Sequence, residues 1–450
     1  MRSLISKPIA DAKAPLKGSP SLPGDKSISH RALIIGASTV GKTVVHGLLE
    51  GDDVLHTAEA LRALGAEISR NDEEVSWHVN GVGVGGLGEA SRVLDMGNSG
   101  TAARLLMGVV ASHPFVTFFT GDASLCRRPM GRVGEPLERM GARVAARTGV
   151  RMPLAVIGTT EPLPITYRVP VPSAQVKSAI LLAGLNAPGT TTVIEQQATR
   201  DHTERMLRAF GANIEVGERD DGSRAIQLTG QPELRPQVVK VPADISSAAF
   251  PLVAALLVPG SDVVLKGVGV NTLRAGLLAS LSEMGAAFRV DPLREEAGEP
   301  TADIVVVNAN KLKAVHVPAA RAPSMIDEYP ILAVAAAVAH GVSRFDGLGE
   351  LRVKESDRLA AIAAGLVANG VKVEIQGESL IVHGCAGPVP GGGSVATHMD
   401  HRIAMAFLVL GLAAKAPIAV DDGRMIDTSF PGFVDLMNGL GAAISQIEAS

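Results

Sequence analysis

Hydrophobic and polar positions follow the same order six times along the chain. Each copy begins with a short polar stretch and continues into a long apolar segment, which predicts a buried helix followed by Gly or Pro and a β-branched strand. A polar loop and a second, amphipathic helix that ends in a Gly-Ala-like turn complete the copy. The predicted buried helices begin 72 to 81 residues apart, at Lys26, Asn98, Ser173, Ser246, Asp327 and His401.

The ends of the second helices recur with a similar spacing. Their glycines lie 70 to 85 residues apart, at Gly65, Gly141, Gly211, Gly285, Gly370 and Gly441. Two markers with one period predict a protein built from repeats. Because 450 residues are too many for one hydrophobic core, we expect two domains of three repeats each.

Two similar segments predict where the chain crosses between these domains. LPGDKS at 22–27 and VPADIS at 241–246 each lead into the first helix of a triplet of repeats. We expect residues 25–242 to form a middle domain, and residues 1–24 plus 243–450 to form a discontinuous domain that includes an N-terminal strand. Two crossings make a hinge, so we expect an active-site cleft between the domains that closes on substrate.

Composition excludes several classes of protein. The chain is 46% hydrophobic, yet no apolar run reaches the ~18–20 residues that a membrane span needs. Two cysteines argue against a disulfide framework and favour a reducing compartment, and the N-terminus lacks the apolar core of a signal peptide, so we expect a cytoplasmic protein. A net charge of −4 gives no electrostatic reason to expect nucleic acid as a partner.

Polar and basic residues gather where the apolar helices begin. A helix N-terminus offers unpaired N–H groups and a partial positive charge, so several such ends facing one cleft would bind a strongly anionic ligand. Ordinary N-caps explain the Ser, Asn and Asp residues at these ends equally well. Caps do not explain the nearby cations, which are Lys26, Arg31, Arg104, Arg128, Arg200, Lys354, Arg358 and Arg402.

One segment matches the phosphate-binding loop of nucleotide hydrolases. GASTVGKT, from Gly36 to Thr43, fits the pattern, but it follows a predicted helix and leads into a strand, whereas a true loop follows a strand and opens a helix. We interpret Gly41 as a helix stop. A nucleotide-binding protein of this kind stays open as an alternative from a different functional class. The 11 histidines show no metal-ligand spacing, so no metal site is predicted.

Seven further motifs occur in a fixed order: PGDKSISHR, GNSGTAAR, RRPMGR, PSAQVKSAILLAGL, IDEYPILAVAAA, LRVKESDRL and MDHRIAMAF. In their order and spacing the chain resembles the 5-enolpyruvylshikimate-3-phosphate synthase family over almost its whole length, and SAQVKSAILLAGLN is most similar to the bacterial class II branch. The resemblance implies an α/β fold. It would be a two-lobed inside-out α/β barrel of six βαβαββ repeats, three per domain, with buried helices and solvent-facing sheets.

The resemblance also implies a reaction. The enolpyruvyl group of phosphoenolpyruvate would pass to the 5-hydroxyl of shikimate-3-phosphate by addition and elimination, releasing phosphate, as a step of aromatic amino-acid biosynthesis. It implies no cofactor and no metal, small-molecule partners only, inhibition by glyphosate, and a monomer. A related enolpyruvyl transferase that acts on UDP-N-acetylglucosamine is the alternative on the same fold. Cys126 lies too close to Arg128 for the loop that such an enzyme would use.

Roles follow motif by motif. The residues implied for catalysis are Asp327 as proton acceptor, Glu355 as proton donor, and Lys26. Those implied for shikimate-3-phosphate are Lys26, Ser27, Arg31, Ser173, Ala174, Gln175, Arg200, Asp327 and Lys354. Those implied for phosphoenolpyruvate are Lys26, Asn98, Gly100, Thr101, Arg128, Gln175, Arg358 and Arg402. The chain departs from the family at Thr428, where many members carry a Lys. A pairing of Glu355 and Asp357 with Lys354 and Arg358 on a surface helix is the non-functional interpretation of LRVKESDRL.

Overall fold

The computed structural model describes residues 2–8, 15–296, 298–306 and 311–447, which divide into two compact units. Unit 1 comprises Met1–Pro23, Pro242–Arg294 and Pro300–Ser450, and unit 2 comprises Gly24–Val241 and Glu295–Glu299. Each unit has a hydrophobic core of its own.

In unit 2, three repeats each supply two helices and one four-stranded sheet. The first consists of β14 (Val238–Lys240), α2 (Lys26–Ala37), β3 (Val40–His46), α3 (Asp52–Ala63), β4 (Glu67–Asn71) and β5 (Ser76–Val82). The second consists of β6 (Leu94–Asp95), α4 (Gly100–Ala111), β7 (Val116–Thr120), the 3-10 turn η1 (Leu125–Arg127), α5 (Gly131–Arg139), β8 (Arg143–Arg147) and β9 (Arg151–Ile157). The third consists of β10 (Thr166–Arg168), α6 (Ala174–Gly184), β11 (Thr190–Glu195), α7 (His202–Ala209), β12 (Ile214–Glu218) and β13 (Arg224–Thr229).

Unit 1 repeats the same plan three times. The fourth repeat consists of β2 (Lys17–Gly18), α8 (Ile245–Leu257), β15 (Asp262–Gly269), α9 (Gly276–Glu283), β16 (Phe288–Glu296) and β17 (Glu299–Val306). The fifth consists of β18 (His316–Val317), η2 (Ala319–Ser324), α10 (Tyr329–Val338), β19 (Val342–Phe345), η3 (Gly349–Val353), α11 (Arg358–Ala368), β20 (Lys372–Gln376) and β21 (Ser379–His383). The sixth consists of β23 (Ser394–Val395), α12 (His401–Leu412), β25 (Ile418–Val420), η4 (Arg424–Thr428), α13 (Phe433–Gly439), β26 (Ile444–Gln446) and β1 (Leu4–Ser6), beside a small sheet of β22 (Val389–Gly391) and β24 (Ala414–Ala416).

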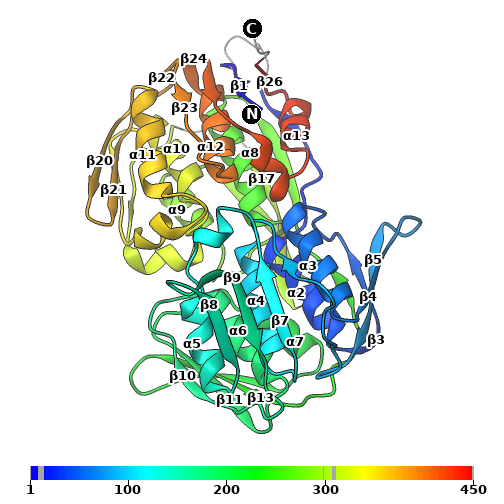
Figure 1. Ribbon diagram of the computed structural model, residues 1–450. Helices are drawn as coiled ribbons and strands as arrows, with labels where there is room; N and C mark the ends of the chain where they lie inside the picture. The colour runs from blue at the N-terminus through cyan, green and yellow to red at the C-terminus, as the bar shows by residue number, and fades with distance from the viewer. Residues whose placement is uncertain (1, 9–14, 297, 307–310, 448–450) are drawn as a thin grey trace. The chain divides into compact units, whose positions relative to one another are not determined.

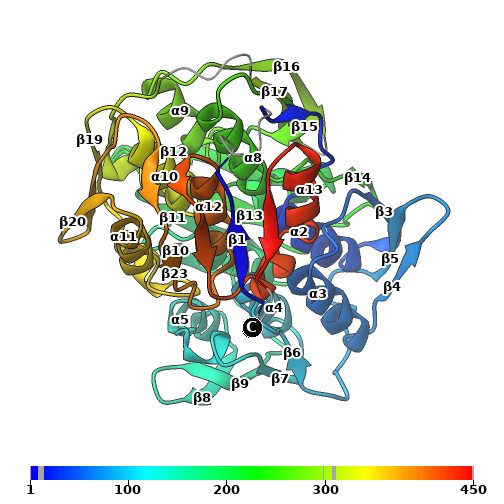
Figure 2. The ribbon, with the colours of Figure 1, turned by 90° about the horizontal axis from the view of Figure 1, so that it is seen from above.

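All six large sheets have the same strand order. The first two strands of a repeat are parallel neighbours in the sheet, and the last two form an antiparallel pair beside them, as in β6-β7-β9-β8. The order βαβαββ predicted for the repeat is thus confirmed. In the sixth repeat the last strand is β1, which pairs with β25 and β26, so that Figure 2 shows the blue N-terminal strand beside the red C-terminal one.

The first helix of each repeat is buried, as its uniform hydrophobicity predicts. Residues 28–37 of α2 and every residue of α12 are shielded from solvent, and in Figure 1 the strands β20 and β21 lie on the outer side of α10 and α11. Close packing requires small residues between these helices. A Cβ at Gly108 of α4 would lie 2.3 Å from the carbonyl oxygen of Ala179 in α6, so only Gly allows the two backbones to approach this closely.

The six glycines that end the second helices all have positive φ, between 78° and 111°. In each case the residue after the glycine donates its backbone N–H to a carbonyl five residues earlier, as Ala66 does to Leu61 at 3.1 Å. This hydrogen bond gives a partner to a carbonyl that would otherwise have none at the end of the helix. The turn requires a residue in the left-handed conformation, which favours Gly. The predicted helix ends are confirmed. Gly41 is different, because α2 ends at Ala37 and Gly41 lies inside β3, where it pairs with Gly81. Its interpretation as a helix stop is wrong.

Candidate active site

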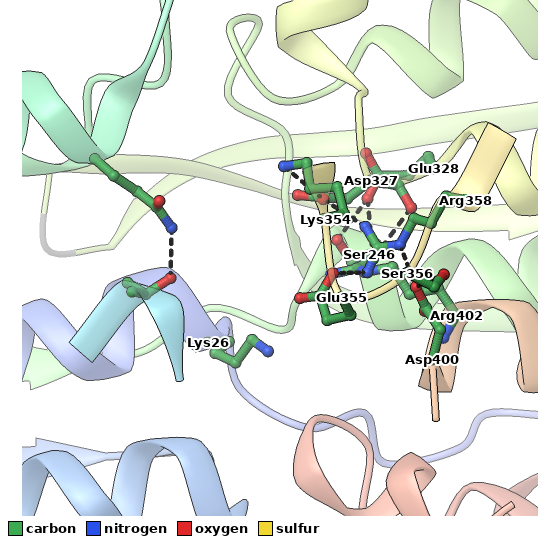
Figure 3. Close-up of polar contacts among 12 residues, drawn as sticks. Lys26, Ser246, Asp327, Glu328, Lys354, Glu355, Ser356, Arg358, Asp400 and Arg402 are labelled. Carbon is green, nitrogen blue, oxygen red and sulfur yellow. Dashed lines mark hydrogen bonds and ion pairs between the residues drawn. The ribbon is translucent and has the colours of Figure 1, made fainter. Parts of the chain in front are cut away.

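In unit 1, the guanidinium of Arg358 joins three carboxylates. Its Nε donates to Asp400 Oδ2 at 2.7 Å and its Nη1 to Asp327 Oδ1 at 3.1 Å, while Nη2 donates to Glu355 Oε2 (Figure 3). Arg358 is the first residue of α11 and is fully buried. Burial alone lowers the pKa of Arg358, but Asp400, Glu355 and Asp327 outweigh it and raise this pKa above the ordinary value. Asp327 and Glu355, the residues predicted to move protons, therefore share one fixed cation.

Lys354 and Arg402 complete this group. The Nζ atom of Lys354 lies 3.5 Å from Asp327 Oδ1, and Nη1 of Arg402 donates to the main-chain oxygen of Asp327 at 3.3 Å. Asp400 caps α12 by accepting from the N–H of Arg402 at 3.0 Å, and it accepts from Ser356 as well. Asp400 is not among the residues predicted from the sequence, although its place directly before the His-Arg pair is a helix-capping signal.

The surface-helix interpretation of LRVKESDRL is wrong for Arg358. A side chain that is 1% exposed does not belong to a solvated face. Asp357 does behave as a surface residue: its carboxylate caps α11 through the N–H of Ala360 and pairs with Arg352 at 3.1 Å. Thr428, which stands where the family often has Lys, turns its hydroxyl back to the carbonyl oxygen of Met425 at 2.7 Å. It therefore supplies no cation.

In unit 2, a chain of hydrogen bonds joins the starts of α4 and α6. Gln175 donates through Nε2 to Thr101 Oγ1 at 2.9 Å and accepts from Arg104 Nη1 at 2.8 Å. Arg104 Nη1 also donates to the carbonyl oxygen of Gly100 at 3.2 Å. Thr101, Gly100 and Gln175, all predicted from the sequence, are thus brought together. Arg104, which was noted only as a nearby cation, holds them in place.

Asn98 and Arg128 form a second predicted pair in unit 2. Nη2 of Arg128 donates to Asn98 Oδ1 at 2.7 Å, and Nη1 donates to the Asn98 carbonyl at 3.2 Å. The amide nitrogen of Asn98 donates to Asp122 Oδ2 at 2.6 Å. Asn98 therefore holds the guanidinium of Arg128, a side chain that is itself mostly buried, in one orientation.

The starts of α2 and α6 carry five of the nine residues predicted for shikimate-3-phosphate. Lys26 pairs with Asp53 at 2.9 Å, and Ser173 caps α6 by accepting from the N–H of Val176. Ala174 and Gln175 open α6, and Ser27 lies one residue into α2. Nothing in the sequence marked Asp53 as a partner, because the contact joins two elements of the repeat that only the fold brings together.

Arg31 is held on three sides. Its Nε donates to Thr203 Oγ1 at 2.7 Å, its Nη2 to Ser178 Oγ at 2.8 Å and its Nη1 to the Ser27 carbonyl at 2.9 Å. Burial lowers the pKa of Arg31 to about 10; Glu204 and Asp25 act against this shift, while the charge of Arg200 adds to it. Arg200, in the loop before α7, thus acts electrostatically on Arg31. Arg31 and Arg200, both predicted to bind an anion, are therefore close enough for their charges to interact.

The described residues contain neither a metal-binding group nor a membrane-spanning helix. Among residues 2–8, 15–296, 298–306 and 311–447, no group of three or more His, Cys, Asp or Glu side chains could hold a metal ion. In the same part of the chain, no helix has the length and apolar character needed to cross a membrane. GASTVGKT runs from the end of α2 into β3, the reverse of a nucleotide-binding loop, which is the outcome that the sequence favoured.

The chain is similar to known proteins over nearly its whole length. Residues 10–437 match the model of the family described as EPSP synthase (3-phosphoshikimate 1-carboxyvinyltransferase). A 3-phosphoshikimate 1-carboxyvinyltransferase of Paramagnetospirillum magneticum is 64% identical, covering 98% of this chain and 99% of its relative, and one of Rhodospirillum rubrum is 62% identical, covering 97% and 98%. The solved structure of EPSP synthase from Acinetobacter baumannii superposes with a TM-score of 0.87 at 41% identity and covers 100% of both chains.

The likeness to that solved structure confirms the predicted two-domain inside-out α/β fold, and the sequence identities extend over nearly the full length of each relative. Sequence identities of 62% and 64% over nearly the full length show membership of one family as well as a common fold. The chain therefore belongs to the EPSP synthase family, the 3-phosphoshikimate 1-carboxyvinyltransferases.

Proposed function

We propose that Asp327 and Glu355 carry the proton transfers of this chain's reaction. As an EPSP synthase, the chain catalyses the transfer of the enolpyruvyl group from phosphoenolpyruvate to shikimate-3-phosphate. The observation that supports the assignment is the attachment of both carboxylates to one buried guanidinium, Arg358. A shared, immobile cation fixes two acid–base groups at a defined separation, as a reaction with two coupled proton transfers requires.

The chemistry assigns a different task to each carboxylate. Asp327 takes the proton of the 5-hydroxyl as that oxygen attacks the enol carbon, and Glu355 delivers a proton to the methylene carbon. The product is a tetrahedral ketal phosphate. In the elimination, the ionised Glu355 takes a methyl proton, the double bond re-forms and the C–O bond to phosphate breaks. The protonated Asp327 gives its proton to the leaving phosphate, so inorganic phosphate leaves, the enolpyruvyl ether remains, and both carboxyl groups return to their starting states. Every atom and electron pair is accounted for by the two substrates and two carboxylates.

The cations hold the two anionic substrates. We assign Arg358, Arg402, Arg128 and Lys26 to phosphoenolpyruvate, together with Asn98, Gly100, Thr101 and Gln175. Arg358 uses three of the five N–H donors of its guanidinium on its carboxylates. We assign Lys26, Ser27, Arg31, Ser173, Ala174, Gln175, Arg200, Asp327 and Lys354 to shikimate-3-phosphate. Fixed cations offset the repulsion between two polyanions.

Phosphate release tests the assignment. The wild-type protein should release phosphate only when both shikimate-3-phosphate and phosphoenolpyruvate are present. Asp327→Asn and Glu355→Gln should each lower kcat by roughly 10²- to 10⁴-fold, the usual contribution of a positioned acid or base. Release with UDP-N-acetylglucosamine in place of shikimate-3-phosphate, or nucleotide hydrolysis abolished by Lys42→Ala, would instead support one of the alternatives.

We also propose that glyphosate inhibits this chain in competition with phosphoenolpyruvate and that the chain acts as a monomer. Gly100, which lacks a side chain, supports the first proposal, because the inhibitor is longer than phosphoenolpyruvate and needs the space. An inhibition constant in the millimolar range would contradict it. Sedimentation equilibrium tests the second, and a dimer mass at micromolar concentration would contradict it.

A further inference from the structure

Glu328 and Arg274 form a buried ion pair in unit 1, next to Arg402 and Asp327. Nη1 of Arg274 donates to Glu328 Oε2 at 2.6 Å, and both side chains are at most 4% exposed. The other oxygen, Oε1, accepts from Ser246 Oγ at 2.5 Å, and Ser246 in turn accepts from Arg274. Glu328 follows Asp327 in the motif IDEYPILAVAAA but has no role assigned to it, and Arg274 lies outside all seven motifs.

Glu328 stands at the position that caps the helix in the other repeats. At the starts of α2, α4, α6, α8 and α12, the N-cap side chain accepts from a backbone N–H of the first turn. At α10 the N-cap is Glu328, and it makes no such bond. A capping hydrogen bond stabilises a helix by about 1 kcal/mol, so we expect the Glu328 carboxylate to make other stabilising contacts in its place. These contacts are the hydrogen bonds that Glu328 accepts from Arg274 and Ser246.

The same carboxylate faces Arg402. Oε1 of Glu328 lies 3.6 Å from Arg402 Nη1, the nitrogen that also donates to the Asp327 carbonyl. The other end of Arg274 lies 3.8 Å from Asp244, the N-cap of α8. The charges thus alternate from Asp244 through Arg274 and Glu328 to Arg402. Arg274 takes up one oxygen of Glu328, so that only the other is available to Arg402.

We propose that Glu328 and Arg274 are positioning residues for phosphoenolpyruvate, which they affect through Arg402. Glu328 fixes the guanidinium of Arg402 against the Asp327 main chain, and Arg274 keeps Glu328 from neutralising the positive charge that the substrate needs. This inference rests on the proposed function of Arg402. Burial raises the pKa of Glu328, but Arg274 and Arg402 outweigh burial and lower it, so the carboxylate stays charged for this purpose.

Two variants separate positioning from simple stabilisation. Glu328→Gln keeps the size of the side chain and its bond with Ser246, but it removes the charge. We expect the KM for phosphoenolpyruvate to rise about ten-fold, equivalent to about 1.4 kcal/mol, while the KM for shikimate-3-phosphate changes less than about two-fold. The buried Arg274 loses its partner, so the unfolding midpoint should also fall.

The double variant Glu328→Gln/Arg274→Met removes both charges of the pair. The unfolding midpoint should return toward the wild-type value, because no buried charge is left unpaired, whereas the KM for phosphoenolpyruvate should stay high. Recovery of both quantities together would overturn the proposal and leave the pair a purely structural element. An equal rise of both KM values in Glu328→Gln would overturn it as well.

A control and an order of experiments keep the two proposals apart. Arg321, whose side chain is 21% exposed, pairs with Glu283 in the same unit at 2.5 Å, and Arg321→Met should leave both KM values unchanged. Phosphate release by the wild-type protein is measured first. Its absence would refute the proposed function. Its presence, with wild-type KM values in the Glu328 variants, would refute the positioning role alone.

Discussion

Gly100 opens α4 with two guanidinium groups beside the space that a side chain would fill. A Cβ there would lie 2.8 Å from Arg104 Nη1 and 3.2 Å from Arg128 Nη1. Both are ends of flexible side chains, so they can move without a change in the backbone. Their displacement would nevertheless disturb the contacts that Arg104 makes with Gln175 and that Arg128 makes with Asn98. A single methyl group at this position therefore acts on the predicted phosphoenolpyruvate residues and spares the fold.

We predict that Gly100→Ala raises the inhibition constant of glyphosate by at least about ten-fold, or about 1.4 kcal/mol. The KM for phosphoenolpyruvate should rise less, because the shorter substrate reaches less far into the space that the methyl group takes. Steady-state kinetics at fixed shikimate-3-phosphate measures both. Gly134→Ala in α5 is the matched control, since its Cβ would make only ordinary contacts of 3.5 to 3.9 Å with Val144. Equal rises of the two constants would contradict the argument.

His30 is a buried residue whose charge state follows from its neighbours. Its Nδ1 lies 2.7 Å from Thr57 Oγ1 and its Nε2 3.5 Å from Ser99 Oγ, the cap of α4. Burial, and then the charges of Lys26 and Arg31, hold the pKa of His30 well below the usual 6.5. The imidazole is neutral in the folded protein, where a third positive charge would oppose the two predicted substrate-binding cations.

Unit 2 should therefore lose stability as the pH falls below 6.5. There the unfolded chain binds a proton at His30 that the folded chain does not, so the free energy of unfolding decreases by up to about 1.4 kcal/mol per pH unit. His30→Asn should remove this part of the slope, and the slope that His113 contributes in the same direction should remain. Trp77, the only tryptophan of the chain, lies in the core of unit 2 and reports its unfolding in urea. Above pH 7 the two slopes should coincide; identical slopes below pH 6 would refute the prediction.

At the scale of elements, the repeat was readable from the sequence because its signals are local. An apolar run, a capping residue and a glycine with positive φ each act within a few residues, and all six glycines end their helices as predicted. Gly41 was misinterpreted because a glycine with positive φ also occurs within strands, and the pattern does not distinguish the two. The helices predicted from Asp327 and Asn98 each begin two residues later, at Tyr329 and Gly100.

Partners of buried charges could not be predicted in the same way. Arg274 lies in a stretch without any motif, and its partner Glu328 is 54 residues away along the chain. Only the packing of α8, α9 and α10 brings them together.

Lys177 shows how charges join elements within one repeat. It lies in α6 and pairs with Glu195 at the end of β11, at 2.9 Å, and with Glu204 in α7, at 2.8 Å, all three side chains being at most 3% exposed. Burial lowers the pKa of Lys177, but Glu204 and Glu195 outweigh it and raise this pKa. The ammonium is therefore the cation that makes two buried carboxylates tolerable.

We predict that Lys177→Met destabilises unit 2 by about 3–5 kcal/mol, the usual cost of leaving a buried charge without its partner. Urea unfolding followed by Trp77 fluorescence measures the loss. Changing Glu195 and Glu204 to Gln in the same protein should restore much of it, because no buried charge is then uncompensated. Arg92→Ala, which breaks a half-exposed pair with Glu59, should have a much smaller effect. A similar loss in both single variants would show that the buried cluster is not special.

At the scale of the whole molecule, two cores with separate residues make ligand binding measurable in each unit. Most of the residues assigned to shikimate-3-phosphate lie in unit 2, and only Asp327 and Lys354 lie in unit 1. A ligand stabilises the structure that it binds, by about 2.7 kcal/mol at a concentration of 100 times its Kd. The distribution of the assigned residues thus predicts which unit responds when only the first substrate is present.

Shikimate-3-phosphate alone should shift the unfolding transition reported by Trp77 to higher urea, by an amount that grows with the logarithm of its concentration. A second probe is Phe288→Trp in a Trp77→Phe background, because Phe288 packs against the core of unit 1. Its transition should shift less, since unit 1 offers the ligand only two of the assigned side chains. Arg31→Met should abolish most of the Trp77 shift. If the unit 1 probe responded as strongly as Trp77, or if Arg31→Met left the shift intact, binding would depend on other residues than those assigned from the motifs.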